Sequence, residues 1–519
     1  MRTSARARRC LLGLVLGFLA IVSISGATGS PLVTPLPPGA EPPGWTHEIA
    51  SALGLAGLGR TGLSILSWTI VAVLVGAFVA LVREANHGRV RPAAALWAAM
   101  TSLAMATAAP MLLSRDIISY ATYARLAVVY GRNPYLVVPA TIRPDPFLMV
   151  TSRQWFQTRS LYGPAFTRVS ELIVRMFPHS PGSVILAFKS LAGLAVAIAV
   201  VLVAWSVGKL RPGRVALAVV LVGLNPVIVI HTVGGGHVDA LLAATLAGAL
   251  AFGVAAQRAV NPRTRAAFEV ATTTVLTLAC LTRILMLPVL ILWLWWVLRS
   301  LTRARIWNVI FHLAIVMGLS VAIFEPFLAG WRTLSWVATL GGIETWASPV
   351  SLIANPLRDL IGAIAGDAAG NVVYAAVVGA FAISAVFLLR RLGKVASLAG
   401  SDLVESAWLT WGPALLLIAM STPYFLPWYA AWFVPFLALM PDDGFMWTGV
   451  AACGVLVLTL IPADPWHGYT SWEVMTSAHF VAAPLMLVLL IGLWIKFRAL
   501  TADASYGAGY TSPGAPNDD

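Results

Sequence analysis

Charge is scarce in this chain of 519 residues. Only 11% of the residues are Asp, Glu, Lys or Arg, whereas 59% are hydrophobic and the mean hydropathy is +0.84. A soluble protein carries roughly a quarter charged residues, so the composition excludes a soluble globular fold. Apolar runs near the length of a bilayer recur along the chain. We therefore predict an all-α polytopic membrane protein, because a helix satisfies its own backbone hydrogen bonds in lipid.

Cysteine and the common cofactor motifs are also lacking. The three cysteines, Cys10, Cys280 and Cys453, show no metal-ligand spacing. No Walker, Rossmann or HExxH motif occurs. The sequence therefore implies no disulfide framework, and it requires neither a cofactor nor a divalent metal.

The apolar runs predict about 13 to 14 transmembrane helices. The pair at 267–282 and 284–299 is short and meets at Arg283, with Pro288 close behind, so it forms either a tight hairpin or a broken helix. The candidate spans lie at about 11–27, 62–82, 93–113, 183–207, 215–232, 239–256, 267–282, 284–299, 306–327, 371–389, 405–421, 425–440, 445–461 and 478–495.

The cations indicate the orientation of these helices. A net charge of +13 would suggest a nucleic-acid partner for a soluble chain, but most Lys and Arg lie in short links between apolar runs. This positive-inside pattern places the amino terminus in the cytoplasm of a multi-pass cytoplasmic-membrane protein and predicts no nucleic-acid partner. Residues 1–500 then form one membrane domain, with external loops at about 114–182 and 328–370 and a disordered cytoplasmic tail at 501–519.

Two further expectations follow from that orientation. The proline-rich stretch from Pro31 to Pro43 reads as an extended external linker. A cysteine placed at Ser160 should react with an impermeant thiol reagent from outside, whereas one at Gly213 should not.

The loop at 114–182 is unusually rich in arginine for an external loop, which points to an anionic partner. Arginine grips phosphate through a planar fork, and aromatic rings suit sugar faces and the depth of lipid headgroups. The alternative is a loop that rests on anionic lipid heads. Its arginines and rings are Arg115, Arg125, Arg132, Arg143, Arg153, Arg159, Arg168, Arg175, Tyr120, Tyr123, Tyr130, Tyr135, Trp155, Phe156 and Tyr162.

Asp116 opens this loop at the end of the third span and is the first candidate for chemistry. A carboxylate is costly to hold near hydrocarbon, so one beside Arg115 at a membrane boundary indicates a functional site. The alternative is a capping Asp. Residues 116–130 are predicted to form an amphipathic interfacial helix that turns Asp116, Tyr120 and Tyr123 toward one cavity. Asp145 lies on a later turn.

A second group of candidates surrounds His237. Three glycines precede it, which lets the backbone approach a ligand closely, and a helix is predicted to begin at Asp239. The alternative is a glycine-rich turn with Asp239 as a helix cap. Arg283 lies between two short apolar runs, where an unpaired cation is expensive, so a lipid-linked phosphate is its natural partner.

Short motifs occur in order along residues 90–440. They are Asp116-Ile117-Ile118-Ser119-Tyr120, Tyr123-Ala124-Arg125, Tyr130-Gly131-Arg132-Asn133-Pro134-Tyr135, Asp145-Pro146-Phe147, Tyr162-Gly163-Pro164, Asn225-Pro226, Gly235-Gly236-His237-Val238-Asp239-Ala240 and Pro427-Trp428-Tyr429. These motifs resemble those of the actinobacterial polyprenyl-phosphomannose-dependent alpha-1,6-mannosyltransferases. The resemblance implies a GT-C membrane glycosyltransferase that takes a lipid-phosphate sugar outside the cytoplasmic membrane and extends the mannan core of lipomannan and lipoarabinomannan. It also implies that Asp116 is the catalytic base.

The partners that the resemblance implies are a polyprenyl-phosphate mannose donor, a mannan glycolipid acceptor and membrane lipids. Transfer would be a single inverting displacement. The chain differs from the family where Val238 replaces a frequent Asn, and where Arg283 replaces the Lys of many GT-C enzymes. The expected substrate-binding residues are Arg115, Tyr120, Tyr123, Arg125, Asp145, Trp155, Tyr162, His237, Asp239, Arg283, Trp428 and Tyr429.

Two alternatives remain open at the level of sequence. A transferase that uses polyprenyl-phosphate arabinose would need similar phosphate contacts. A non-enzymatic transporter or flippase for a polyprenyl-linked glycan would explain Lys189 and Arg283 as charges inside the membrane.

Overall fold

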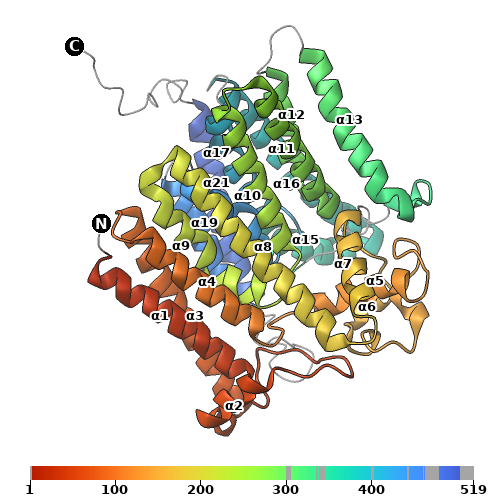
Figure 1. Ribbon diagram of the computed structural model, residues 1–519. Coiled ribbons are helices and arrows are strands. Elements are labelled where there is room, and N and C mark those ends of the chain that lie inside the picture. The colour runs from red at the N-terminus through yellow and green to blue at the C-terminus, as the bar shows by residue number, and fades with distance from the viewer. Residues whose placement is uncertain are drawn as a thin grey trace.

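The computed structural model describes residues 3–299, 305–334, 337, 345, 347–398, 403–440, 443–459, 461 and 478–502. Helices make up the ordered elements of this part of the chain, which contains no strand beyond two isolated bridges (Figure 1). The predicted all-α class is confirmed. Residues 503–519 of the expected tail lie outside the described residues.

In the described part of the chain, seven helices are long and apolar enough to cross a membrane, and an eighth span is possible if a bent pair counts as one. The bent pair joins α9 (Val215–Gly223) to a π-helix (Val227–Val233) at an angle of 44°. The seven helices are α1 (Ala5–Ser25), α3 (Gly59–Asn86), α8 (Pro181–Leu210), α10 (Asp239–Arg258), α13 (Arg305–Phe324), α16 (Asp367–Leu398) and α21 (Ala483–Ala502).

The expected number of 13 to 14 spans is therefore larger than the structure supports. The other apolar runs do form helices, but these are too short or too polar to qualify as spans: α4 (Pro92–Ala108), α11 (Pro262–Thr282), α12 (Leu287–Arg299), α17 (Leu403–Met420), α18 (Ala430–Phe433) and α19 (Asp443–Leu456).

Burial explains this difference. Residues 411–420 and 427–440 are buried almost without exception, so their apolar character comes from the centre of the bundle rather than from lipid contact. By contrast, α13 and α16 expose most of their apolar side chains, as lipid-facing helices do. Hydropathy alone does not separate these two environments.

The arginine-rich loop 114–182 folds into a compact unit at one end of the bundle. It contains α5 (Asp116–Val128), a turn at Leu148–Val150, α6 (Arg153–Phe156) and α7 (Pro164–Met176), which lie together in Figure 1. The helix predicted at 116–130 is present as α5. It is not interfacial, however, because its residues 117–126 are all buried. The helix therefore packs inside the protein on all sides along these residues.

The proline-rich stretch is packed as well, at least along Ser30–Leu36, which we call the strap. Leu113 donates its backbone N–H to Leu32 O at 2.9 Å, and the Thr34 hydroxyl donates to Ser114 O at 3.3 Å. Leu112 in turn donates its N–H to Gly234 O at 3.0 Å. The stretch that we expected to be an extended external linker is thus tied to the segment that precedes Asp116.

The prediction that Ser160 is accessible from outside is also wrong. It is fully buried, and its N–H donates to Pro134 O at 2.9 Å. A reagent in water would not reach a cysteine there. Met149 in the same loop is 69% exposed and is a better position for labelling.

Candidate active site

Three breaks in the helical bundle meet at the end that carries the arginine-rich loop. They are the start of α5, the glycine turn Gly234–Gly236 before α10, and the break between α11 and α12 at Arg283. A short turn at Pro427–Tyr429 completes the group. At each break the backbone leaves the regular helix. Polar side chains can therefore lie close together there without being placed inside a membrane span.

Asp116 is the first residue of α5, and Arg115 occupies the capping position without a side-chain capping bond. The Asp116 N–H donates to Ser114 Oγ at 3.1 Å. One carboxylate oxygen, Oδ2, accepts the Tyr120 hydroxyl at 3.3 Å and lies 3.2 Å from His237 Nδ1. The Asp116 side chain keeps 16% of its surface exposed. The carboxylate is therefore oriented by neighbouring side chains and stays reachable, unlike a simple helix cap.

Tyr120 links Asp116 to the glycine turn. Its hydroxyl donates to Asp116 and accepts the Val238 N–H at 3.3 Å. Burial raises the pKa of Tyr120 well above its usual range, with the nearby Asp116 carboxylate adding to this effect. The phenol therefore remains a neutral hydrogen-bond donor to Asp116. Tyr162 packs edge-on against it, with ring centroids 4.8 Å apart.

The glycine turn requires its glycines for steric reasons. Gly236 has φ +66°, and a Cβ there would collide with Ile117 of α5. A Cβ on Gly235 would lie 2.7 Å from His237 Nε2. The His237 ring stacks on Trp428 at a centroid distance of 3.5 Å and an angle of 15°. This close approach holds His237 against Asp116.

A second carboxylate anchors a buried arginine. The guanidinium of Arg283 lies 3.6 Å from Asp239 Oδ2, and Trp432 Nε1 donates to Asp239 Oδ1 at 2.7 Å. Arg283 is only 2% exposed. Its charge lies 5.6 Å from the centre of the Tyr162 ring and 5.5 Å from that of Tyr429. Two aromatic faces therefore flank the cation, a favourable arrangement where water is excluded.

Arg283 has more hydrogen-bonding capacity than its protein neighbours use. Among the residues that the structure describes, no acceptor reaches its Nε or Nη1, although both atoms are buried. An unsatisfied buried charge is expensive, and the planar fork of arginine matches the oxygens of a phosphate or carboxylate. The arrangement can bind an anion beside Asp116 and Tyr120.

The candidate residues Arg125 and Asp145 lie in a different cluster. Arg125 Nε donates to Asp145 Oδ2 at 2.7 Å, and Arg125 Nη1 donates to Pro178 O at 2.8 Å. The Tyr130 hydroxyl and the Phe147 N–H also donate to the Asp145 carboxylate, each at 3.0 Å. Both charges are buried and satisfied within the loop, so their geometry is that of a scaffold.

Three other candidates also contact the loop itself. The Tyr123 hydroxyl donates to Thr158 O at 2.9 Å, and Arg115 Nη1 donates to Val150 O at 3.4 Å. Trp155 is half-buried on α6 against the apolar core of the loop. Of the candidate residues, the structure brings together Asp116, Tyr120, Tyr162, His237, Asp239, Arg283, Trp428 and Tyr429.

Two further residues support the site. Trp432 fixes Asp239 through its hydrogen bond. In the sequence, only its position three residues after Tyr429 in an aromatic-rich segment could have marked it as a site residue. Lys189 of α8 is buried and donates to Ala109 O and, at 2.6 Å, to Pro110 O. Lys189 therefore anchors the end of α4, whereas Arg283 pairs with Asp239. The transporter interpretation treated Lys189 and Arg283 together, but the structure gives them separate partners.

Comparison with known proteins identifies the family of the chain. The sequence model for the N-terminal domain of alpha-(1→6)-mannopyranosyltransferases matches residues 14–329. Alpha-(1→6)-mannopyranosyltransferase A of Mycobacterium tuberculosis is 27% identical over 438 residues, which is 79% of this chain and 77% of the relative. A probable alpha-(1→6)-mannopyranosyltransferase of Mycolicibacterium smegmatis is 23% identical over 74% of this chain and 71% of its own length.

A shorter match joins this chain to alpha-(1→6)-mannopyranosyltransferase A of Corynebacterium glutamicum, at 29% identity over 26% of this chain and 27% of the relative. No solved structure matches the chain significantly. The family match covers Asp116, His237, Asp239 and Arg283 and spans well over half of the sequence. The chain therefore belongs to the alpha-(1→6)-mannopyranosyltransferase family and is a membrane-embedded mannosyltransferase.

Proposed function

We propose that this enzyme transfers mannose from a polyprenyl-phosphate donor to the growing mannan of a cell-envelope glycolipid, with an α-1,6 linkage. One observation carries the proposal. An accessible carboxylate, Asp116, lies in the same polar cluster as a buried guanidinium, Arg283, whose Nε and Nη1 meet no acceptor among the described residues. Glycosyl transfer from a lipid phosphate needs a base for the acceptor hydroxyl and a cation for the departing phosphate.

Asp116 is proposed as the base. As the acceptor oxygen forms its bond to the anomeric carbon of mannose, its proton passes to the Asp116 carboxylate and the bond to the phosphate oxygen breaks. Tyr120 and His237 hold Asp116 in position for this step. A β-linked donor then gives an α-linked product in one inverting displacement, and polyprenyl phosphate leaves with the electron pair of the broken bond.

Arg283 is proposed to bind the donor phosphate through Nε and Nη1. The phosphate gains negative charge as it leaves, so a cation in a water-poor site stabilises the transition state more than the ground state. Asp239 and Trp432 keep the guanidinium in place. The rings of Tyr162, Trp428 and Tyr429 lie around the same centre and suit the faces of a sugar.

We further propose that the site faces the outside of the cytoplasmic membrane. The basic links, such as Arg83–Arg91 and Lys209–Arg214, join helix ends opposite those that carry Asp116 and Arg283. The positive-inside rule assigns that basic end to the cytoplasm. A donor attached to polyprenyl phosphate fits the outer face, because a nucleotide sugar is a cytoplasmic substrate. The proposed acceptor is the core of lipomannan and lipoarabinomannan.

Transfer by the purified protein tests this function. We expect protein in liposomes, without an ion gradient, to move radiolabelled mannose from synthetic polyprenyl-phosphate mannose to a mannoside acceptor. Matched reactions would offer polyprenyl-phosphate arabinose and a mannose nucleotide. Preference for arabinose or for the nucleotide would contradict the proposed donor. Movement of the lipid between leaflets without any glycosidic product would favour the flippase alternative instead.

A further inference from the structure

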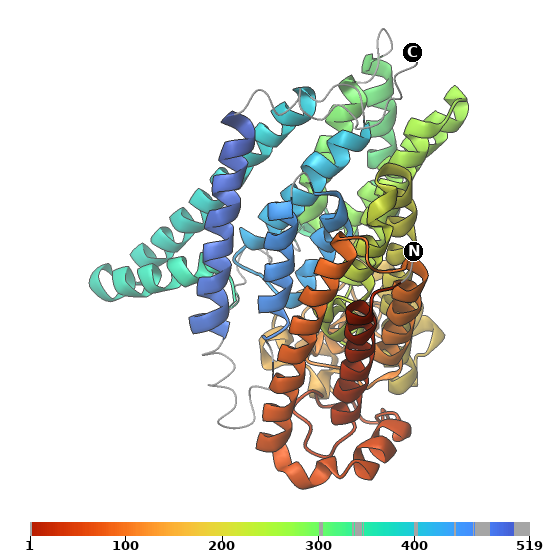
Figure 2. The same cartoon turned by 90° about the vertical axis from the view of Figure 1, so that its left-hand side faces the viewer.

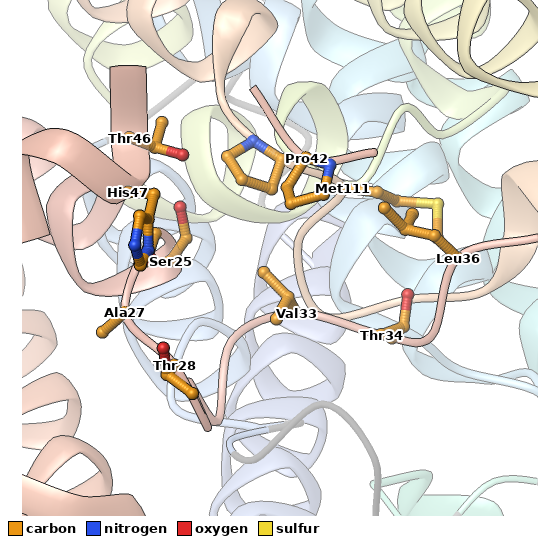
Figure 3. A pocket seen from close by; sticks show the side chains of 12 residues that line it. Ser25, Ala27, Thr28, Val33, Thr34, Leu36, Pro42, Thr46, His47 and Met111 are labelled. Atoms are coloured by element: carbon orange, nitrogen blue, oxygen red, sulfur yellow. Dashed lines mark hydrogen bonds between the residues drawn. The ribbon is translucent and has the colours of Figure 1, made fainter. Parts of the chain in front are cut away.

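A small cavity lies between the strap and the end of α1, outside the proposed catalytic centre (Figure 3). It has a volume of about 230 Å³ and is lined mainly by apolar atoms. None of its lining residues is Asp, Glu, Lys or Arg. Its polar side chains carry hydroxyl groups and one imidazole. The residues that line the cavity include Thr28, Val33, Leu36, Thr46, His47 and Met111.

The cavity shares its wall with the segment that positions Asp116. Val33 of the strap forms a bridge with Leu112, and the Thr34 hydroxyl donates to Ser114 O. Met111, on the other side of the cavity, belongs to the same segment. Ser114 Oγ then accepts the Asp116 N–H. A molecule in this cavity would therefore touch the strap, at Val33, and the segment that leads to Asp116, at Met111.

The helix α2 (Gly44–Ala52) indicates at which level of the membrane the cavity lies, because it supplies the lining residues Thr46 and His47. This helix lies beyond the end of α1 (Figures 1 and 2). Around it, Leu53 is 62% and Leu58 49% exposed, and Trp45 is also exposed. Exposed Trp and Leu beside the end of a span are typical of the membrane interface. The cavity thus lies at the level where lipid chains join their headgroups.

We propose that this cavity binds the acyl–glycerol region of the glycolipid acceptor and so directs the sugar chain toward Asp116. The inference rests on the proposed function, because it assumes a lipid-anchored acceptor. The volume is below that of a typical small-molecule pocket, so it takes a short segment rather than an oligosaccharide. Methylene groups would pack on Val33, Leu36 and Met111. An ester oxygen would accept a hydrogen bond from the Thr28 hydroxyl, since the Thr46 hydroxyl already donates to Pro43 O and His47 Nδ1 to Gly26 O. The uncharged lining fits this neutral region and does not fit phosphate.

A matched pair of substitutions tests the proposal. Leu36→Trp fills the cavity, whereas Leu53→Trp places the same ring on an exposed interfacial position that does not line it. Each protein would be assayed with a lipid-anchored mannoside and with a water-soluble mannoside that has the same terminal sugars. For Leu36→Trp we expect KM for the lipid-anchored acceptor to rise about tenfold, the effect of losing burial of roughly two methylene groups. KM for the soluble acceptor and kcat should stay within about twofold of the wild type.

Val33→Thr is a second variant in case Leu36→Trp folds poorly, because threonine has nearly the same shape as valine. It should raise the same KM in the same direction by about threefold, since it replaces a methyl group by a hydroxyl at an apolar wall. Equal changes for the two acceptors, or no change for either, would overturn the proposal. The rate of the wild type with the soluble acceptor reports on the proposed transfer reaction separately.

A binding measurement separates failure of this inference from failure of the proposed function. An acceptor glycolipid with a photoreactive group beside its ester should label residues 27–47 or Met111 in the wild type. The label should be lost in Leu36→Trp and kept in Leu53→Trp. The label should be displaced by unlabelled glycolipid but not by phospholipid. If an excess of phospholipid displaced it equally well, the cavity would hold bulk lipid, and the assignment to the acceptor would be contradicted.

Discussion

Asp116→Asn is expected to lower kcat by a factor of about 100 or more, the usual cost of losing a general base. The amide keeps the shape of the side chain and can still meet the Tyr120 hydroxyl, but it cannot take a proton from the acceptor. Donor affinity and thermal stability should change little, because Asp116 is partly exposed and Arg283 is paired with Asp239 instead. Single-turnover transfer with saturating donor would measure the effect.

Asp145→Asn is the matched control for this substitution. Asp145 is a second carboxylate of the same loop, but it is buried and bound to Arg125 and Tyr130. Its replacement should lower the melting temperature, because Arg125 loses its buried partner, while the folded fraction keeps most of its activity. If Asp116→Asn retained turnover within a few-fold of the wild type, Asp116 would not be the base.

Arg283→Ala is expected to weaken donor binding by about 1.5 to 3 kcal/mol, the scale of charge-assisted hydrogen bonds. The substitution deletes the buried cation, two of whose nitrogens meet no acceptor in the described part of the chain. It also leaves Asp239 buried without its partner, so a loss of stability should accompany the loss of affinity. Titration with the polyprenyl-phosphate donor and with the acceptor separately would show which of the two constants moves.

Arg283→Lys separates the two effects of that change. Lysine keeps the positive charge for Asp239 but lacks the planar fork, so stability should be largely retained and donor affinity only partly restored. A change confined to the acceptor constant in both variants would show that Arg283 does not bind the donor phosphate.

Several candidate residues named from the sequence lie together in the structure, whereas the packing around them differs from the predictions. Asp116 and Arg283 stand out because a charge at a membrane boundary or between apolar runs needs a reason to be there. The helical spacing predicted that Asp116, Tyr120 and Tyr123 would face one cavity. The Tyr120 hydroxyl does donate to Asp116, whereas that of Tyr123 donates to Thr158 O. Sequence could not show that His237 also lies against Asp116, since 121 positions separate them and only the fold of the glycine turn joins them.

The ion pair inside the arginine-rich loop could not be predicted from the sequence either. Arg125 and Asp145 look like site residues in the sequence because they are a cation and an anion beside aromatic rings. The structure instead uses them to satisfy one another inside the loop. The strap reads as a linker because proline favours extended chain, yet an extended chain can also pair with a neighbouring segment, as Val33 does with Leu112. Backbone pairing of this kind leaves little trace in composition.

The sidedness of the protein tests the central claim most directly, because a lipid-phosphate donor outside the membrane requires Asp116 on that face. Met149→Cys and Gly213→Cys would be made in a chain whose partly exposed Cys10 is replaced by Ser. An impermeant thiol reagent added to intact spheroplasts should label Met149→Cys and leave Gly213→Cys unlabelled until the membrane is opened. Labelling of Gly213→Cys with protection of Met149→Cys would place the site in the cytoplasm, where a nucleotide sugar would be the donor, and would contradict the account.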